Sequence, residues 1–352
     1  MDINSETLRK AGVGIKLASD AQMLSEQKED VSNGYIERQK LRDLNNKINT
    51  LYRTESRSEL LRETVKEAVA NLPNIDVPEV RSRIENEKTL VVALGDFHYG
   101  ADICVHGLRG EVINRYDHEV FEERMAQLHK EIVKILKKEY IEKVNIFLVG
   151  DLIDGMLRQS QLMRLEYGVV ESTMRLSEYL AIWLNKLSKS AMVEVFAVTG
   201  NHSEVRPLKS KCREFEDENL EKIVVWYLQE RLRDNENIEV NFACNKYLLT
   251  EIQGFSFLLL HGDGDKAISQ IARETVNMYS EKIDFFVCGH KHREEEIPAG
   301  TTSDGNSVVI RTPSLCGVDS YAQSRGYCGK PGAIATVIER GYGRRCVYPI
   351  NL

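Results

Sequence analysis

The chain has 352 residues, of which 42% are hydrophobic and 29% are charged, with a formal net charge of −7. This is an ordinary composition for a globular protein, and it excludes collagen-like and wholly disordered chains. The acidic balance argues against a broadly basic protein that coats nucleic acid. The longest apolar runs, such as residues 255–260, are far shorter than the roughly 20 residues of a membrane span. Because the N-terminus also lacks the apolar core of a secretory signal, we expect a cytoplasmic protein with no membrane association.

Residues 1–88 differ in composition from the rest of the chain, since they contain no cysteine, histidine or tryptophan. Residues 37–72 place leucine, isoleucine and valine at helical spacing among many charges of both signs, which predicts amphipathic helices. Pro73 and Pro78 end this pattern and indicate a linker. We predict that residues 1–88 form a helical extension that binds a protein partner or forms a homo-oligomer. A nucleic-acid-binding arm is the alternative.

Residues 89–352 alternate between short apolar strands and amphipathic helices. The predicted elements, in chain order, are strand 89–94, helix 117–138, strand 144–149, helix 172–190, strand 193–198, helix 214–233, and strands 238–250, 254–260, 284–288, 307–311, 333–339 and 345–348. Strand–helix alternation followed by strand-rich sequence predicts an α/β domain with a mixed second sheet.

Short polar motifs follow five of the predicted strands, and they contain five of the eight histidines. The motifs are Gly95–Gly100 (GDFHYG), Gly150–Gly155 (GDLIDG), Gly200–Glu204 (GNHSE), His261–Asp263 (HGD) and Gly289–His292 (GHKH). In an open α/β sheet the crevice beyond the carboxyl ends of the strands is where sites form. A single Gly-Asp or Gly-Asn could be a simple turn, but five such motifs in succession predict a metal site.

The residue types in these motifs favour two metal ions. Carboxylate, imidazole and amide groups are present, no cysteine lies within a motif, and an aspartate can bridge two cations. In an extended segment, residues i and i+2 point to the same side, so both members of Asp-x-His or His-x-His can face the site. Two cations roughly 3.5–4 Å apart can clamp a phosphoryl group and generate a hydroxide near neutral pH.

The order D-x-H, G-D-x-x-D, G-N-H, H-G-D, G-H-x-H resembles the calcineurin-like metallophosphoesterases over about residues 89–320. The helical N-terminus and the loop at 313–332 look like those of phage- or prophage-encoded members, which are related to DNA-repair exonuclease-like phosphoesterases. The resemblance implies a four-layer α/β/β/α sandwich with mixed sheets over residues 89–352. It also implies a host-cytoplasmic location if the protein is phage-encoded.

The resemblance also implies a role for each motif residue. The first metal would be held by Asp96, His98 and His292 and the second by Asn201, His261 and His290, with Asp151 bridging the two. A metal-bridging hydroxide would attack phosphorus, while His202 protonates the leaving oxygen and Asp154 orients that histidine. Mn²⁺ is the expected metal, with Fe, Zn, Ni and Co as alternatives.

The expected substrate is a phosphodiester of a nucleic acid or nucleotide. One alternative is a phosphomonoesterase that acts on a small molecule or phosphoprotein. Another is a non-catalytic scaffold with the same fold. Arg158 and Arg206 could contact a phosphate, although the sequence favours exposed helix charges for both. Tyr99 could stack on a base or sugar, and a packed aromatic explains it equally. Asp154 could instead cap a helix. The third motif departs from the family pattern because Ser203 stands where an acidic residue is usual, which puts the hydrogen bonds of that carboxylate in doubt.

Overall fold

The computed structural model describes residues 39–40, 42, 59, 63, 66–67, 69–81, 87–155, 159–205, 217–243, 246–263, 267–302, 305–327 and 329–352. Residues 72–352 form one compact unit, which carries the features discussed below, and residues 1–71 form a separate unit. Most residues of the predicted amphipathic helices at 37–72 lie outside the described residues. No helix in the described part of the chain is long and apolar enough to cross a membrane.

A six-stranded sheet forms the first half of the compact unit. Its strands, in spatial order, are β13 (Gly343–Asn351), β12 (Gly332–Glu339), β1 (Lys88–Leu94), β4 (Lys143–Leu148), β5 (Met192–Ala197) and β6 (Ile238–Phe242). The four strands from β1 to β6 run parallel, whereas β12 pairs antiparallel with both β1 and β13. The sheet is therefore mixed, and the carboxyl ends of β1, β4 and β5 lie at one edge.

A five-stranded sheet forms the second half. Its spatial order is β10 (Glu295–Thr302), β11 (Gly305–Arg311), β9 (Phe285–Cys288), β8 (Phe255–Leu259) and β7 (Leu248–Ile252). The inner strands β8, β9 and β11 are parallel, and the edge strands are antiparallel to their neighbours. The strand predicted at 238–250 is corrected here, because it divides into β6 and β7, which belong to different sheets.

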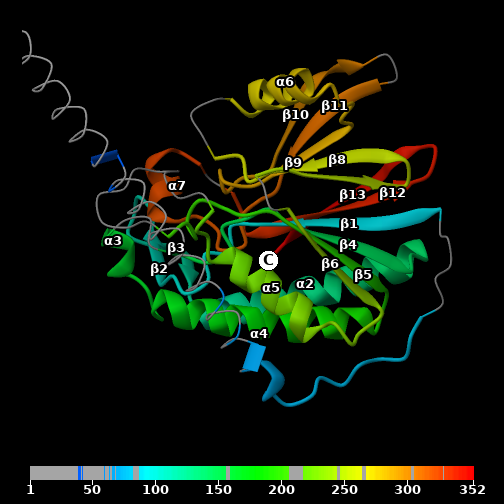
Figure 1. Cartoon of the computed structure of the whole chain (residues 1–352). Helices are drawn as coiled ribbons and strands as arrows, with labels where there is room; N and C mark the ends of the chain where they lie inside the picture. The colour runs from blue at the N-terminus through cyan, green and yellow to red at the C-terminus, as the bar shows by residue number, and fades with distance from the viewer. Residues whose placement is uncertain are drawn as a thin grey trace, which may run out of the picture. The chain divides into compact units, whose positions relative to one another are not determined.

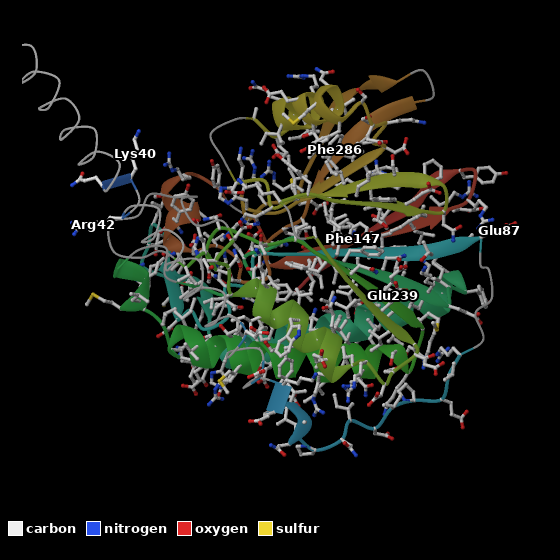
Figure 2. All side chains as sticks on the ribbon, viewed as in Figure 1. Lys40, Arg42, Glu87, Phe147, Glu239 and Phe286 are labelled. Carbon is white, nitrogen blue, oxygen red and sulfur yellow. The ribbon has the colours of Figure 1, made fainter. Side chains whose placement is uncertain are left out.

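Helices cover the outer face of each sheet, and the two inner faces pack on each other (Figure 1). The first sheet carries α2 (His118–Glu139), α4 (Val169–Ser188) and α5 (Glu221–Arg231), and the second carries α6 (Ile268–Tyr279). Phe147 belongs to the core between the sheets and Phe286 to the core under α6, as Figure 2 shows. The layers therefore follow in the order helices, sheet, sheet, helix, and the predicted α/β fold with mixed sheets is confirmed.

The sequence of α2 explains why it forms and where it packs. Asp117 caps its first turn by accepting a 3.0 Å hydrogen bond from the Val120 backbone N–H. Phe121, Met125 and Leu128 begin a stripe of fully buried side chains at helical spacing. Burying each such side chain stabilises the fold by about 1.5–3 kcal/mol. The buried stripe thus anchors α2 on the outer face of the first sheet, which contains β1 and β4.

The segment around Pro73 and Pro78, which was predicted as a linker, lies against the helical layer. Arg231 donates to the Pro73 carbonyl at 2.7 Å, Asn185 donates to the Asp76 carbonyl at 3.0 Å, and Asn237 donates to the Glu79 carbonyl at 2.9 Å. Because these bonds reach α4, α5 and the loop before β6, the segment is part of the compact unit.

The burial of the cysteines predicts which thiols react with an alkylating reagent, and this tests the fold. Among the described cysteines, Cys104 and Cys346 are exposed, whereas Cys288 and Cys316 are fully buried. Burial raises the pKa of Cys288 to about 11, and the thiolate is the reactive form. Brief alkylation of the native protein near neutral pH should therefore label the two exposed thiols and spare the two buried ones until denaturant is added. Peptide mapping by mass spectrometry measures this, and rapid labelling of Cys288 in the native protein would contradict the packing.

Candidate metal centre

The motif residues meet where parallel strands of both sheets end. Strands β1, β4 and β5 of the first sheet and β8 and β9 of the second lead directly into the five motifs. A sixth segment, which follows β11, also reaches this place. There the Leu315 N–H donates to the Gly95 carbonyl and the Cys316 N–H to the Asp96 carbonyl, each at 3.2 Å. The loop after β11 thus holds the backbone of the first motif in place through these two hydrogen bonds.

Five of the predicted metal-binding residues have left-handed backbone conformations. Their φ angles are 52° for Asp96, 46° for His98, 53° for Asp151, 74° for His290 and 51° for His292. Such conformations cost about 1–3 kcal/mol each outside glycine and cluster at functional sites. The extended backbone assumed for Asp-x-His and His-x-His is therefore corrected: the side chains converge because both residues of each pair turn into the left-handed region.

Backbone contacts hold the first three motifs together. The Asp96 N–H donates to the Gly150 carbonyl and the His98 N–H to the Asp151 carbonyl, both at 3.0 Å. Gly200 lies so close to Asp151 that an added Cβ would collide with the backbone nitrogen of that aspartate. Glycine is therefore required at position 200 by close approach.

The first group of candidate ligands centres on His98 and His292. Their Nε2 atoms are 3.1 Å apart, and the His292 Nε2 lies 3.8 Å from the Asp96 Oδ1. The Asp96 carboxylate also accepts a 2.8 Å hydrogen bond from the His290 backbone N–H. The Nδ1 of His292 is buried without a hydrogen-bond partner among the described residues. Two ring nitrogens this close, beside a buried carboxylate, are well placed to bind one shared cation.

The second group centres on His261. Its Nε2 lies 2.9 Å from the Asp151 Oδ2, 3.1 Å from the Asn201 Oδ1 and 3.3 Å from the His290 Nδ1. Its Nδ1 lies 2.8 Å from the Val149 carbonyl, which fixes the tautomer that leaves Nε2 free to bind a metal. All seven predicted metal-binding residues thus lie in two adjoining groups, and the donor set fits two divalent cations.

A histidine–aspartate pair lies beside these groups. The Nδ1 of His202 is 2.8 Å from the Asp154 Oδ1, and the Nδ1 of His98 is 3.5 Å from the same oxygen. Both contacts place this carboxylate between two imidazoles, and the next helix in the described part of the chain, α3 (Gln159–Leu162), begins five residues after Asp154. Although burial alone would raise the pKa of Asp154, its hydrogen bonds with His202 and His98 hold that pKa well below the usual range.

The charge of the metal-free site is divided among its histidines. Burial lowers the pKa of His98, but the hydrogen bond to Asp154 and the charge of Asp151 outweigh burial and raise that pKa to about 9. Burial opposes protonation of His261 as well, yet Asp151 raises its pKa well above the usual value. Burial and the charge of His261 lower the pKa of His290 to about 4. Near neutral pH the metal-free site therefore holds protons on His98 and His261 and leaves His290 neutral.

This distribution predicts that metal binding releases protons. A cation must displace the protons of His98 and His261, so the metal-free protein should release more than one proton on binding Mn²⁺ near pH 7. The number should fall as the pH rises through about 9, where His98 deprotonates before the metal arrives. Calorimetry in buffers of different ionisation enthalpy measures the release. Equal binding enthalpies in all buffers would contradict the prediction.

The residues predicted to contact substrate have different outcomes. Arg158 and Arg206 lie outside the described residues. Tyr99 is only 3% exposed, and its ring packs edge-on against Phe121 with centroids 4.9 Å apart. The predicted stacking of Tyr99 on a base is therefore corrected to a packing role in the core.

Sequence reasoning missed three residues at the site. Cys316 lies with His98 and His292 in a group whose candidate ligand atoms are all within 4.8 Å of one another, although no thiolate was expected. Gln161 donates weakly to Asp154 at 3.4 Å. Glu221, the first residue of α5, accepts a 2.6 Å hydrogen bond from Ser203, the residue at which the third motif departs from the family pattern. Only Ser203 gave a signal in the sequence, because its departure leaves a carboxylate unaccounted for.

Comparisons with known proteins identify the family of the chain. The family model "Calcineurin-like phosphoesterase" matches residues 89–294, more than half of the chain. The chain is 29% identical, over 316 residues, to the SPbeta prophage-derived uncharacterized protein YonJ of Bacillus subtilis (strain 168), covering 89% of this chain and 76% of that protein.

Among solved structures, a metallophosphoesterase from Sphaerobacter thermophilus is 12% identical, with a TM-score of 0.34 and coverage of 75% of this chain and 88% of that one. A dimetal phosphatase from Danio rerio is 14% identical, with a TM-score of 0.33 and coverage of 75% and 98%. The family match covers all five strand-end motifs and confirms the resemblance seen in the sequence. The chain belongs to the calcineurin-like phosphoesterases, a family of metal-dependent hydrolases.

Proposed function

We propose that this protein is a binuclear-metal phosphodiesterase that acts on nucleic acid or nucleotides. The observation that carries the proposal is the pair formed by His202 and Asp154 directly beside the two groups of candidate metal ligands. The leaving group of an alkyl phosphodiester is an alkoxide, which departs slowly unless it is protonated. A histidine whose Nδ1 is held by a carboxylate can supply that proton from Nε2.

The metal-binding roles in this proposal follow the two groups. Asp96, His98 and His292 would hold one cation, Asn201, His261 and His290 the other, and Asp151 would bridge them. Two divalent cations bound there would polarise the phosphoryl oxygens and provide a hydroxide nucleophile near neutral pH. Manganese is the proposed ion because a carboxylate, imidazole and amide set suits it, although iron and zinc suit the same set.

The chain itself contributes orientation and proton transfer. Asp154 holds the tautomer of His202, and the His202 backbone N–H in turn donates to the Asp151 Oδ1 at 2.8 Å. The proton donor and the bridging carboxylate are therefore fixed relative to each other. Pre-positioning of this kind removes the need to reorganise the site during the reaction.

Two further parts of the proposal concern the setting of the enzyme. We propose a cytoplasmic location, in the host if the protein is phage-encoded, and a protein partner or self-association through residues 1–88. The prophage origin of YonJ supports the phage setting. Crosslinking and light scattering of the full chain, compared with a chain that begins at residue 72, would test the second part.

Hydrolysis assays test the activity directly. The purified protein with Mn²⁺ should hydrolyse bis(4-nitrophenyl) phosphate faster than 4-nitrophenyl phosphate, and EDTA should abolish both rates. Single- and double-stranded DNA and a dinucleotide should then be compared at equal metal concentration.

Each outcome of these assays has a distinct meaning. A monoester preference would replace the proposal with a phosphomonoesterase. Absence of hydrolysis of every ester with Mn²⁺, Fe²⁺, Co²⁺ and Ni²⁺ would leave only the scaffold role.

A further inference from the structure

A buried carboxylate lies behind the motifs that supply the bridging aspartate and the proton donor. Glu221 is 1% exposed, and its Oε1 accepts from the Leu152 backbone N–H at 2.7 Å and from the Ser203 hydroxyl at 2.6 Å. Its Oε2 accepts from the Gly200 backbone N–H at 2.8 Å. One side chain therefore satisfies donors from two separate loops.

Backbone pairing delivers this carboxylate to its place. The Leu220 N–H donates to the Ser203 carbonyl at 2.9 Å, and the Asn219 side chain donates to the Gly200 carbonyl at 2.8 Å. The Asn219 Oδ1 also accepts from the Glu221 N–H at 2.9 Å. Hydrogen bonds thus join the start of α5 to the third motif and hold Glu221 beside it.

The donors that Glu221 binds adjoin three residues of the candidate site. One N–H follows Asp151 in the chain, a second precedes Asn201, and the hydroxyl belongs to the residue after His202. Water cannot replace the carboxylate easily, because the position is closed to solvent and a buried unpaired N–H is unfavourable. The Glu221 carboxylate therefore joins the two loops, in addition to the direct hydrogen bond from the His202 N–H to Asp151.

We infer that Glu221 is a positioning residue that holds Asp151 at the correct distance from Asn201 and His202. It would set the geometry of the second metal site and of the proton donor without touching metal or substrate. The inference rests on the proposed function for its kinetic consequences, but its consequences for metal binding are independent of which ester is cleaved.

An exchange of side chains tests this role. Because the Ser203 hydroxyl and the Glu221 carboxylate touch, the double variant Ser203→Asp/Glu221→Ser returns a carboxylate to the same place from the other residue. It should be compared with Glu221→Ser and Glu221→Gln. Glu178→Gln is the control, since Glu178 also binds α5, by accepting from Arg231 at 3.1 Å, but is more exposed than Glu221 and lies outside the motifs.

Three readouts distinguish positioning from general stability: Mn²⁺ affinity by calorimetry, the electron paramagnetic resonance signal of a coupled Mn²⁺ pair, and kcat separated from KM. Glu221→Ser should lower the affinity for the second ion and kcat by about 10–100-fold each, weaken the coupled signal and change KM little. The double variant should recover most of each loss, and Glu178→Gln should show none.

Two results would overturn the inference: a wild-type coupled signal, affinity and kcat in Glu221→Ser, or equal losses in Glu178→Gln. If the serine variant does not fold, Glu221→Gln, which keeps the volume, decides by the same criteria. An inactive wild-type protein would overturn the proposed function instead, while the affinity and resonance comparison would still decide the role of Glu221.

Discussion

The Asp151→Asn protein should lose both metal ions and hydrolyse diesters at least about 10³-fold more slowly than the wild type. Asp151 lies 2.9 Å from His261 and shares a group of candidate ligands with His98, so it is the residue common to both halves of the site. Asparagine keeps an oxygen that can accept from the His202 N–H, and the fold should therefore survive. Elemental analysis after gel filtration, together with the diesterase rate, measures the effect.

A matched control is available at the opposite end of the second sheet. Asp284, which precedes β9, accepts hydrogen bonds from the Ser256 N–H and hydroxyl, both at 2.9 Å. Asp284→Asn removes the charge of a hydrogen-bonded carboxylate at the amino end of β9, whereas the fifth motif follows the carboxyl end of that strand. It should retain both metals and the wild-type rate. If Asp151→Asn also retained two metals, the bridging role would be refuted.

The His202→Ala protein should keep its metals but turn over about 10²–10⁴-fold more slowly, the usual contribution of a positioned general acid. His202 belongs to one of the candidate ligand groups, but its Nδ1 is already bound to Asp154 at 2.8 Å. The loss should therefore fall on kcat rather than on metal content. Steady-state kinetics combined with metal analysis separates these quantities.

The leaving group provides the internal control for His202. A diester with a nitrophenolate leaving group needs less proton donation than one with an alkoxide, so the alanine variant should lose less activity on the activated ester. Asp154→Asn should show the same pattern with a smaller loss, about 10–100-fold. Equal losses on both esters would show that His202 acts through something other than proton donation.

Much of the fold was predictable because many of its helices and strands have clear local sequence signals. The buried runs that became β1, β4 and β5 are short, apolar and followed by Gly-Asp or Gly-Asn, which places both the strand and the turn. Asp117 marks the start of α2 within one residue of its observed bound. Parallel strands then bring their carboxyl ends to one edge, so the meeting of the motifs follows from the topology.

The missed elements carry weak or contradictory signals. Strand β10 contains Pro298 and Gly300, which both argue against a strand, and it exists because it lies at a sheet edge and bulges between these residues. Helix α6 is the exception, because Ile268, Ala272 and Val276 stand at helical spacing and pack in the core, so its sequence does carry a helical signal that the prediction overlooked. The run 238–250 was predicted as one strand, although Asn245 and Lys246 interrupt its β-branched and aromatic residues, and its two parts pair in different sheets.

The site residues that belong to the strand-end motifs were predictable, whereas those that other parts of the chain supply were not. Asp96, Asp151 and His261 each follow a strand, so their residue type and position suffice. Glu221 lies seventeen residues beyond the end of the third motif in an ordinary helical sequence, and only tertiary contacts, such as the hydrogen bond from Leu220 to Ser203, bring it to the site. The left-handed conformations are likewise a property of the assembled loops, because neither Asp-x-His nor His-x-His specifies them.

Titration of the metal-free protein with Mn²⁺, while the diesterase rate is recorded, tests the central claim most directly. The two adjoining ligand groups predict that the rate rises to a plateau at about two equivalents of Mn²⁺ per chain, with little activity at one equivalent. The Asp151→Asn protein should give no rise at any ratio. A plateau at one equivalent, or a diesterase rate that does not respond to metal, would contradict a binuclear centre.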